Sequence, residues 1–202
     1  MALGGGIFVT QNKELPGSYI NFVNAQAISS TVGERGTVAI ALPLNKAPGE
    51  VIEVTKVQFV QDTQNVLGKA YDSKELAPLR EIFCHATKVV IYDLGSDGTI
   101  EDAIVALEPC EFNVLCAYTD VAEDISAQIE AVKGWRDEMG KKCQVVVYSQ
   151  DNPDHEGVIN VVSSVSDSDV DLFALVAWVA GAEAGCKINS SCTNMVYDGE
   201  YT

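Results

Sequence analysis

The sequence has few basic residues. Its 202 residues contain 13 Lys and Arg against 29 Asp and Glu, which gives a formal net charge of −16 at pH 7. Nucleic acids and anionic membrane surfaces are themselves negative, so electrostatic repulsion counts against both as binding partners. We therefore expect a protein that contacts neither nucleic acid nor membrane.

A long apolar run and a secretion signal are also missing. The longest apolar run, residues 172–182, is too short to span a bilayer and is typical of a buried helix. The first six residues, Met-Ala-Leu-Gly-Gly-Gly, lack the basic and apolar regions of a signal peptide. These absences predict a soluble, cytoplasmic protein.

The cysteines do not form a metal-binding pattern. None of the six belongs to a C-x-x-C pair of the kind that begins a zinc site. Cys116 and Cys143 fall inside apolar runs, which favours free, buried thiols in a reducing compartment over disulfides. We expect no bound metal and no cofactor.

Three short apolar runs rich in β-branched residues occupy the middle of the chain, at residues 88–94, 112–118 and 143–148. Helix-like segments between them give a β-α-β-α-β order, in which parallel strands are buried on both faces. Further strands are expected at residues 36–44, 51–56 and 158–162, and further helices at residues 72–86 and from Asp167 or Ser168 to Ala184. The sequence thus predicts an α/β fold with a mixed, largely parallel sheet flanked by helices.

Local signals place the ends of the two central helices. Thr99 and Asp102 open the first, which Pro109 closes. The second has a capping box of Asp120 and Glu123 and ends at Gly140. Its inward face is predicted to carry Val121, Ile125, Ile129, Val132 and Met139. The last helix, which ends near Ala184, is apolar on nearly every side, so we expect another part of the protein to cover it.

No motif in the chain supports a nucleotide or calcium site. The loop at residues 95–99, Gly-Ser-Asp-Gly-Thr, has neither G-x-G-x-x-G spacing nor a P-loop lysine, and its aspartate would repel a phosphate. We interpret it as a turn. Asp167, Asp169 and Asp171 are spaced like the start of a calcium loop, but the required Gly and Glu are replaced by Leu172 and Trp178. Capping of a helix explains the three acidic residues better.

Nucleophilic catalysis is not supported either. Cys84 and His85 are adjacent, which on a helix directs their side chains about 100° apart. His155 lies in an acidic loop, and no G-x-S-x-G surrounds Ser149. We predict no catalytic residue, and a small α/β nucleotide-binding domain or enzyme is kept as the alternative.

Residues 1–24 do not have the pattern of a compact domain. A glycine triplet at residues 4–6 and a turn at residues 15–18 precede a stretch that alternates between polar and apolar residues, as a half-buried strand does. Such a terminal strand either folds back on its own sheet, the ordinary arrangement, or pairs with the edge of another subunit. The candidate interface residues of this extended arm are Tyr19, Ile20, Asn21, Phe22 and Val23.

Both ends of the chain resemble one family. Residues 4–6 (Gly-Gly-Gly), 11–13 (Gln-Asn-Lys) and 15–22 (Leu-Pro-Gly-Ser-Tyr-Ile-Asn-Phe) are similar, in this order, to the N-terminus of contractile tail sheath proteins. The nearest resemblance is to the compact sheaths of phage-like elements and R-type bacteriocins. Residues 35–44 resemble the family's next strand, and residues 177–185 and 194–200 resemble a later helix and the strand after it.

The resemblance implies a structural subunit without enzymatic activity, which polymerises around an inner tube and contracts by rearranging its lattice. Its partners would be further copies of itself, the inner tail tube protein and baseplate components. Its location would be a virion or phage-tail-like particle that is assembled in the bacterial cytoplasm. We expect a strand-exchange arm at residues 1–24, an α/β body at 25–192, and at 193–202 the start of a strand that leads to a C-terminal portion absent from this chain.

Overall fold

The computed structural model describes residues 35–149, 153–187 and 189–201, and every structural statement below concerns these residues. The predicted arm, with its candidate interface residues 19–23, lies outside them. Its pairing with a neighbouring subunit therefore stays a prediction.

A six-stranded sheet forms the centre of the body, with the strand order β2-β3-β1-β4-β5-β6. Five strands are parallel, and β2 runs antiparallel to β3 at one edge. The strands are β1 (Thr37–Leu42), β2 (Val51–Thr55), β3 (Lys88–Asp93), β4 (Val114–Cys116), β5 (Gln144–Val147) and β6 (Val158–Asn160). The predicted mixed, largely parallel α/β sheet is confirmed.

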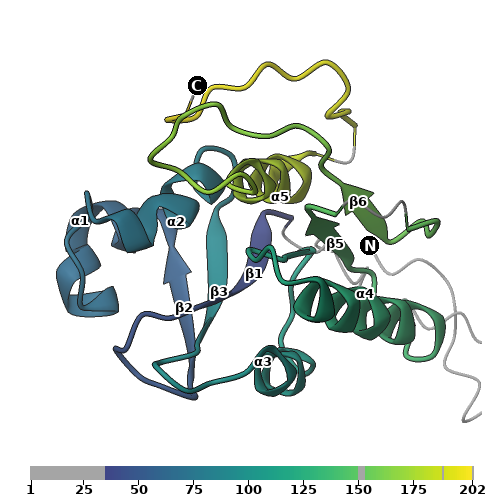
Figure 1. The fold of residues 1–202 in the computed structure, drawn as a ribbon, viewed down its shortest axis with the longest axis horizontal. Coiled ribbons are helices and arrows are strands. Elements are labelled where there is room, and N and C mark those ends of the chain that lie inside the picture. Colours follow the sequence, from purple (N-terminus) through teal and green to yellow (C-terminus); the bar gives the residue numbers. More distant parts are fainter. Residues whose placement is uncertain (1–34, 150–152, 188, 202) are drawn as a thin grey trace, which may run out of the picture. The chain divides into compact units, whose positions relative to one another are not determined.

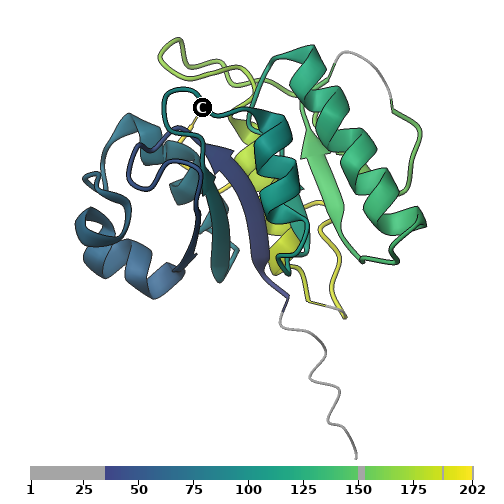
Figure 2. The ribbon, with the colours of Figure 1, turned by 90° about the horizontal axis from the view of Figure 1, so that it is seen from below.

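Helices cover both faces of this sheet (Figure 1). On one face pack α1 (Lys56–Leu67), α2 (Ala77–Ile82) and α5 (Leu175–Gly185), with a short 3-10 turn, η2 (Lys74–Leu76), before α2. On the other face pack α3 (Ile100–Leu107) and α4 (Ala122–Asp137), which Figure 2 shows side by side. Within these described ranges, no helix is both long and apolar enough to cross a membrane.

Alternation along the strands divides the core between the two faces. In β1, Val38 and Ile40 belong to the cluster under α2 and α5, whereas Ala39 between them belongs to the cluster under α3 and α4. All three side chains are fully buried. Because both faces of the sheet are covered, the strands appear in the sequence as continuous apolar runs.

Two of the predicted helix starts are wrong. Asp120 does not cap α4; the helix begins at Ala122, and the Thr119 hydroxyl accepts the N–H of Val121 at 3.1 Å just before it. The last helix begins at Leu175 and not after Asp167 or Ser168. The Asp167 carboxylate instead accepts the N–H of Asp169 at 3.0 Å in the preceding loop, so the acidic triplet does not cap a helix. Short polar side chains stabilise turns in the same way as they cap helices.

Two further helical features differ from the prediction. Helix α1 was not predicted, although Thr55 and Gln58 form a complete capping box at its start. The inward face of α4 is shorter than expected: Ile125, Ile129 and Val132 are buried, whereas Val121 and Met139 lie beyond the helix ends and are 45% and 59% exposed. Of the helix expected at residues 72–86, only η2 and α2 form, with a proline in the first turn of α2 as expected.

Candidate functional site: the carboxy-terminal clasp

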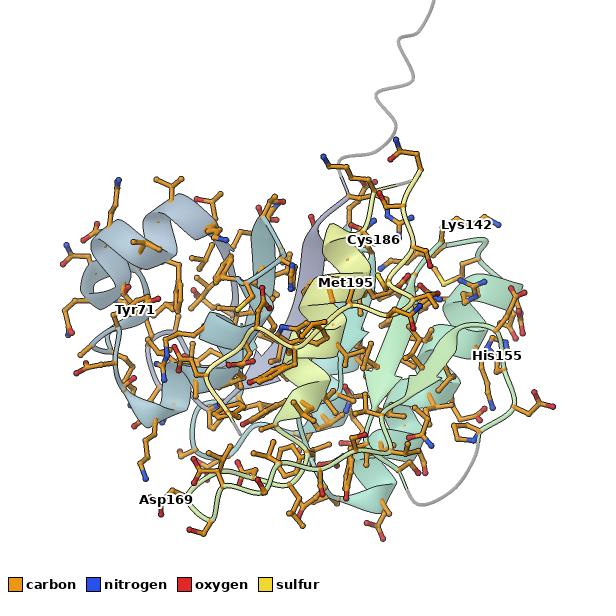
Figure 3. All side chains as sticks on the ribbon, turned by 90° about the horizontal axis from the view of Figure 1, so that it is seen from above. Tyr71, Lys142, His155, Asp169, Cys186 and Met195 are labelled. Atoms are coloured by element: carbon orange, nitrogen blue, oxygen red, sulfur yellow. The ribbon has the colours of Figure 1, made fainter. Side chains whose placement is uncertain are left out.

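Helix α5 is apolar on nearly every side, and seven of its eleven residues are buried. It packs on the sheet and on α2, while residues 193–201 cross its outer side (Figures 1 and 3). Gly181 and Gly185 permit the close approach to α2, because a Cβ at either position would collide with the backbone carbonyl of Ile82 or His85. The expectation that another part of the protein covers this helix is confirmed.

Residues 197–201, which we call the clasp, are bound to α2 through a buried carboxylate. Glu81 on α2 is 0% exposed and accepts two hydrogen bonds from the clasp, from the Tyr197 hydroxyl at 3.0 Å and from the backbone N–H of Glu200 at 2.7 Å. The same hydroxyl accepts the N–H of Tyr201 at 2.8 Å. One buried carboxylate and one hydroxyl therefore organise the whole segment.

The clasp contains a glycine at its closest approach to α2. A Cβ at Gly199 would overlap both the Glu81 carboxylate and the Tyr197 ring. The backbone of the clasp consequently comes close enough for its amide groups to reach side chains. The strand that we expected to begin at residues 193–202 is not formed within residues 193–201. The amide of Glu200 instead binds the Glu81 side chain of the body, and the amide of Tyr201 binds the Tyr197 hydroxyl within the clasp.

One ion pair and several hydrogen bonds hold the edges of the clasp. The Arg80 Nε lies 2.9 Å from both carboxylate oxygens of Glu200, while its Nη1 donates to the backbone carbonyls of Tyr71 and Ser73 at 2.8 and 2.9 Å. Asp198 accepts the indole N–H of Trp178 at 2.8 Å and lies 3.1 Å from the His85 ring nitrogen. Arg80 is fixed in position by these four oxygen partners, so its pairing with Glu200 is more rigid than a single surface ion pair.

The pKa values of Glu81 and Asp198 are shifted in opposite directions. Burial raises the pKa of Glu81, and the neighbouring Glu200 adds to this effect, while the hydrogen bonds from the clasp oppose it. The hydrogen bond from Trp178, together with the nearby His85, lowers the pKa of Asp198. Because Tyr197, Asp198 and the backbone of Glu200 are all hydrogen-bonded to side chains of the body, the clasp is arranged to hold a segment of chain in place.

A second buried carboxylate, Asp93, holds a loop at the carboxyl end of β3. It is 0% exposed at the end of β3 and accepts five backbone N–H groups at 2.7–3.0 Å, those of Leu44, Asn45, Lys46, Ala47 and Gly95. Sequence reasoning missed this residue, although an aspartate that ends a buried strand was a usable signal. It ties the loop between β1 and β2 to the end of β3.

The place where an open α/β sheet holds a nucleotide is acidic here. A pocket of about 660 Å³ lies at the carboxyl ends of β1 and β4, beside the first turn of α3, where the strand order changes direction. Its charged lining residues are Lys74, Glu75, Glu101, Asp124 and Asp171. The loop at residues 95–99 forms a turn, as predicted, and the N–H of Gly98 is bound to the Leu94 carbonyl at 2.8 Å. Four carboxylates and one lysine are an unfavourable lining for phosphate.

The other residues considered in the sequence have structural surroundings. Cys116 and Cys143 are buried free thiols, as predicted, and burial raises the pKa of both. His85 faces the clasp, whereas His155 lies 3.6 Å from the Asp137 carboxylate. The backbone N–H of Ser149 donates to the Asn160 side chain at 3.1 Å. Across the described ranges, no group of three or more His, Cys, Asp or Glu side chains is placed to hold a metal ion.

Two models of known protein families match the sequence of this chain. Residues 96–202 match the phage tail sheath protein central domain, and residues 35–94 match the N-terminal region of domain III of the tail sheath protein Gp18. The chain therefore belongs to the phage tail sheath family, and the resemblance read from the sequence is confirmed. This membership identifies a structural protein and not an enzyme, and it leaves the nucleotide-binding alternative without support.

Two proteins of Bacillus subtilis (strain 168) are similar in sequence. The uncharacterized protein YqbK is 33% identical over 123 residues, and the phage-like element PBSX protein XkdK is 34% identical over 110 residues. These matches cover 56% and 52% of this chain but only 26% and 23% of the relatives. The chain thus spans about a quarter of the length of these curated relatives.

Solved sheath proteins share the fold. The sheath tail protein of Desulfitobacterium hafniense superimposes with a TM-score of 0.74 at 22% identity, covering 91% of this chain and 66% of that one. The sheath tail protein of Listeria innocua gives 0.70 at 21% identity, with 83% and 60% covered. The helical sheath of the anti-feeding prophage in its contracted state gives 0.54 at 15% identity, with 84% and 52% covered.

Proposed function

We propose that this chain forms part of the sheath subunit of a contractile phage tail or phage-tail-like particle. In this function the subunit polymerises helically around an inner tube and works by rearrangement of its lattice, without catalysis. The match of residues 96–202 to the sheath central domain carries the proposal. The anti-feeding prophage sheath, which adopts the same fold in a contracted helical assembly, supports it.

The construction of the body suits such a role. A sheath subunit has to change its neighbours without unfolding, so its own fold must be stiff. Here the sheet is covered on both faces, and the clasp and Asp93 use fully buried carboxylates to fix segments that would otherwise be loose. Rearrangement then takes place between bodies, where no internal contact has to break.

We further propose that residues 1–24 act as the exchanged arm, with Tyr19, Ile20, Asn21, Phe22 and Val23 pairing with the sheet of a neighbouring subunit. An extended strand gives many backbone hydrogen bonds to the neighbour, while the glycine and proline residues before it absorb rotation. This division leaves the α/β body at residues 25–192 and a last segment at 193–202, which contains the clasp and which we propose continues into a further C-terminal portion.

The partners that follow from this function are copies of the same subunit, an inner tail tube protein and baseplate components. The location is a virion or a phage-tail-like particle, and we propose that the particle is assembled in the bacterial cytoplasm. We propose no nucleic acid among the partners. The net charge of −16 would repel it, and in this function the inner tube lies between the sheath and any packaged genome.

Immunoelectron microscopy tests the proposal. Antibodies raised against the purified chain are bound to particles from a producing culture, and gold label is expected along the outside of the tail. Label confined to heads or fibres, or present only on free protein, would contradict a sheath function. Antibodies absorbed with the purified chain serve as the control.

Thermal shift measurements test the alternative that the chain is a nucleotide-binding domain. A nucleotide present at 100 times its Kd would stabilise a binding protein by about 2.7 kcal/mol. We expect no shift with adenine, guanine or nicotinamide nucleotides, because the pocket beside α3 is lined mainly by carboxylates. A concentration-dependent shift with any of them would favour the nucleotide-binding alternative.

A further inference from the structure

Two of the free cysteines come together where α5 ends. Cys186 directly follows the helix, and its N–H donates to the Glu183 carbonyl at 3.4 Å. Cys192 lies on the segment that leads to the clasp, and its thiol donates to the Ala182 carbonyl at 3.4 Å. Ala182 and Cys186 are four residues apart, about one helical turn, so this bond brings the Cys192 sulfur to the turn that carries Cys186.

The Cys186 thiol is turned to the same end of the helix, where it donates to the Lys187 carbonyl at 3.7 Å. Burial raises the pKa of Cys192 to about 12, and the Cys186 side chain and Glu183 contribute to this shift. Both cysteines are half-buried and neither is in a disulfide. This arrangement differs from that of Cys116 and Cys143, which are buried within the core.

We propose that Cys186 and Cys192 are a redox pair that closes to an intramolecular disulfide when the protein meets a small-molecule disulfide oxidant such as oxidised glutathione. The thiolate of one cysteine attacks the oxidant, which forms a mixed disulfide and releases one glutathione thiolate. The second cysteine loses its proton to solvent and attacks the mixed disulfide, which releases the second glutathione. The two protein sulfurs are oxidised, and the oxidant is reduced to two thiols.

The position of this pair gives the disulfide a structural effect. It would join the end of α5 to the segment before the clasp by a covalent bond, which closes the short loop between them. The clasp itself is held only by hydrogen bonds, ion pairs and ring contacts. Oxidation would therefore add a covalent attachment, reversible by reduction, close to a segment that is otherwise held by non-covalent contacts. The proposal is independent of the sheath function proposed above.

Peptide mapping tests the pair directly. The reduced chain is incubated with oxidised glutathione at pH 8.5, where more thiolate is present, then alkylated and digested with trypsin without reduction. Trypsin cleaves after Lys187, which separates Cys186 from Cys192. We expect loss of two of the six thiols and one linked peptide pair that disappears on reduction.

Cysteine variants show which two thiols form the disulfide. The peptide that carries Cys186 also carries Cys143, so the linked pair must persist in Cys143→Ala and vanish in Cys186→Ser and in Cys192→Ser. Cys84→Ser serves as a control that keeps the link. Six intact thiols after oxidation would overturn the proposal. So would glutathione adducts on both cysteines without a linked peptide, or a link that survives in Cys186→Ser.

Discussion

The Glu81 carboxylate and the Tyr197 hydroxyl are 116 positions apart in sequence and form a hydrogen bond of 3.0 Å. Glu81 is fully buried on α2, and a buried carboxylate is costly unless it is hydrogen-bonded. The clasp supplies the partners that this carboxylate requires. Loss of the clasp contacts should consequently also lower the free energy of unfolding of the body.

Replacement of Tyr197 by Phe measures this coupling. The variant keeps the ring and its contact with Trp178 but removes the hydroxyl that donates to Glu81 and accepts from Tyr201. Loss of these partners should reduce the free energy of unfolding by about 1–3 kcal/mol. Chemical denaturation followed by tryptophan fluorescence measures the change.

A matched control is available for that substitution. Tyr71 also packs against an aromatic neighbour, Phe59, but is 45% exposed. Tyr71→Phe should change stability by less than about 0.5 kcal/mol. Equal effects of the two substitutions would show that the hydroxyl of Tyr197 does not hold the clasp.

Asp93→Asn tests the second buried carboxylate. An amide keeps the shape but replaces one acceptor oxygen with an NH₂ group, which would face backbone N–H groups. We expect a loss of about 2–3 kcal/mol at neutral pH. Asp97→Asn in the exposed turn nearby serves as the control and should have little effect.

The effect of Asp93 should depend on pH with a definite sign. Burial acts to raise the pKa of Asp93, but the backbone N–H groups outweigh it and lower the pKa below its usual value. A lowered pKa in the folded state stabilises the fold above the unfolded pKa of about 3.9, and this contribution is lost as the pH falls through the folded value. The stability difference between wild type and Asp93→Asn should be constant above about pH 5 and shrink in more acidic solution. A difference that grows on acidification would contradict this account.

The sheet could be predicted because strands buried on both faces leave a direct trace in the sequence. The run at residues 88–94 contains β3, and the run at 143–148 contains β5. Helix ends were less predictable. Asp120 and Asp167 are good capping residues, but the same side chains favour turns, and the local backbone path decides between the two.

The clasp could not be predicted from local pattern. Glu81 has the sequence surroundings of a solvent-facing helix residue, and its burial is caused by Tyr197 and Glu200 more than 100 positions later. The alternation near the end of the chain suggested a strand. In the structure the backbone of Gly199 instead passes over Glu81, a contact that depends on tertiary packing alone.

Two glycine substitutions in helices should have opposite effects. Gly181→Ala places a Cβ against the backbone carbonyl of Ile82, so α2 and α5 have to separate, and stability should fall by about 1–3 kcal/mol. Gly134→Ala in α4 meets nothing within 4 Å and should stabilise the protein by about 0.5–1 kcal/mol, because alanine is the better helix former. Differential scanning calorimetry of both variants measures the sign of each change in stability. A stabilising Gly181→Ala would show that the helix crossing is looser than described.

The last prediction concerns the proposed arm. Proline at Ile20 would remove a backbone N–H donor and fix φ, which a strand paired on both sides tolerates poorly. If residues 19–23 pair with a neighbouring subunit, Ile20→Pro in the full-length protein should keep a near-normal melting temperature yet form no tubular sheath in electron micrographs. Ile20→Val, which keeps the donor and the strand preference, should assemble normally. Normal tubes from Ile20→Pro would refute arm exchange at this position, whereas a collapsed melting temperature would place the strand in the sheet of its own subunit.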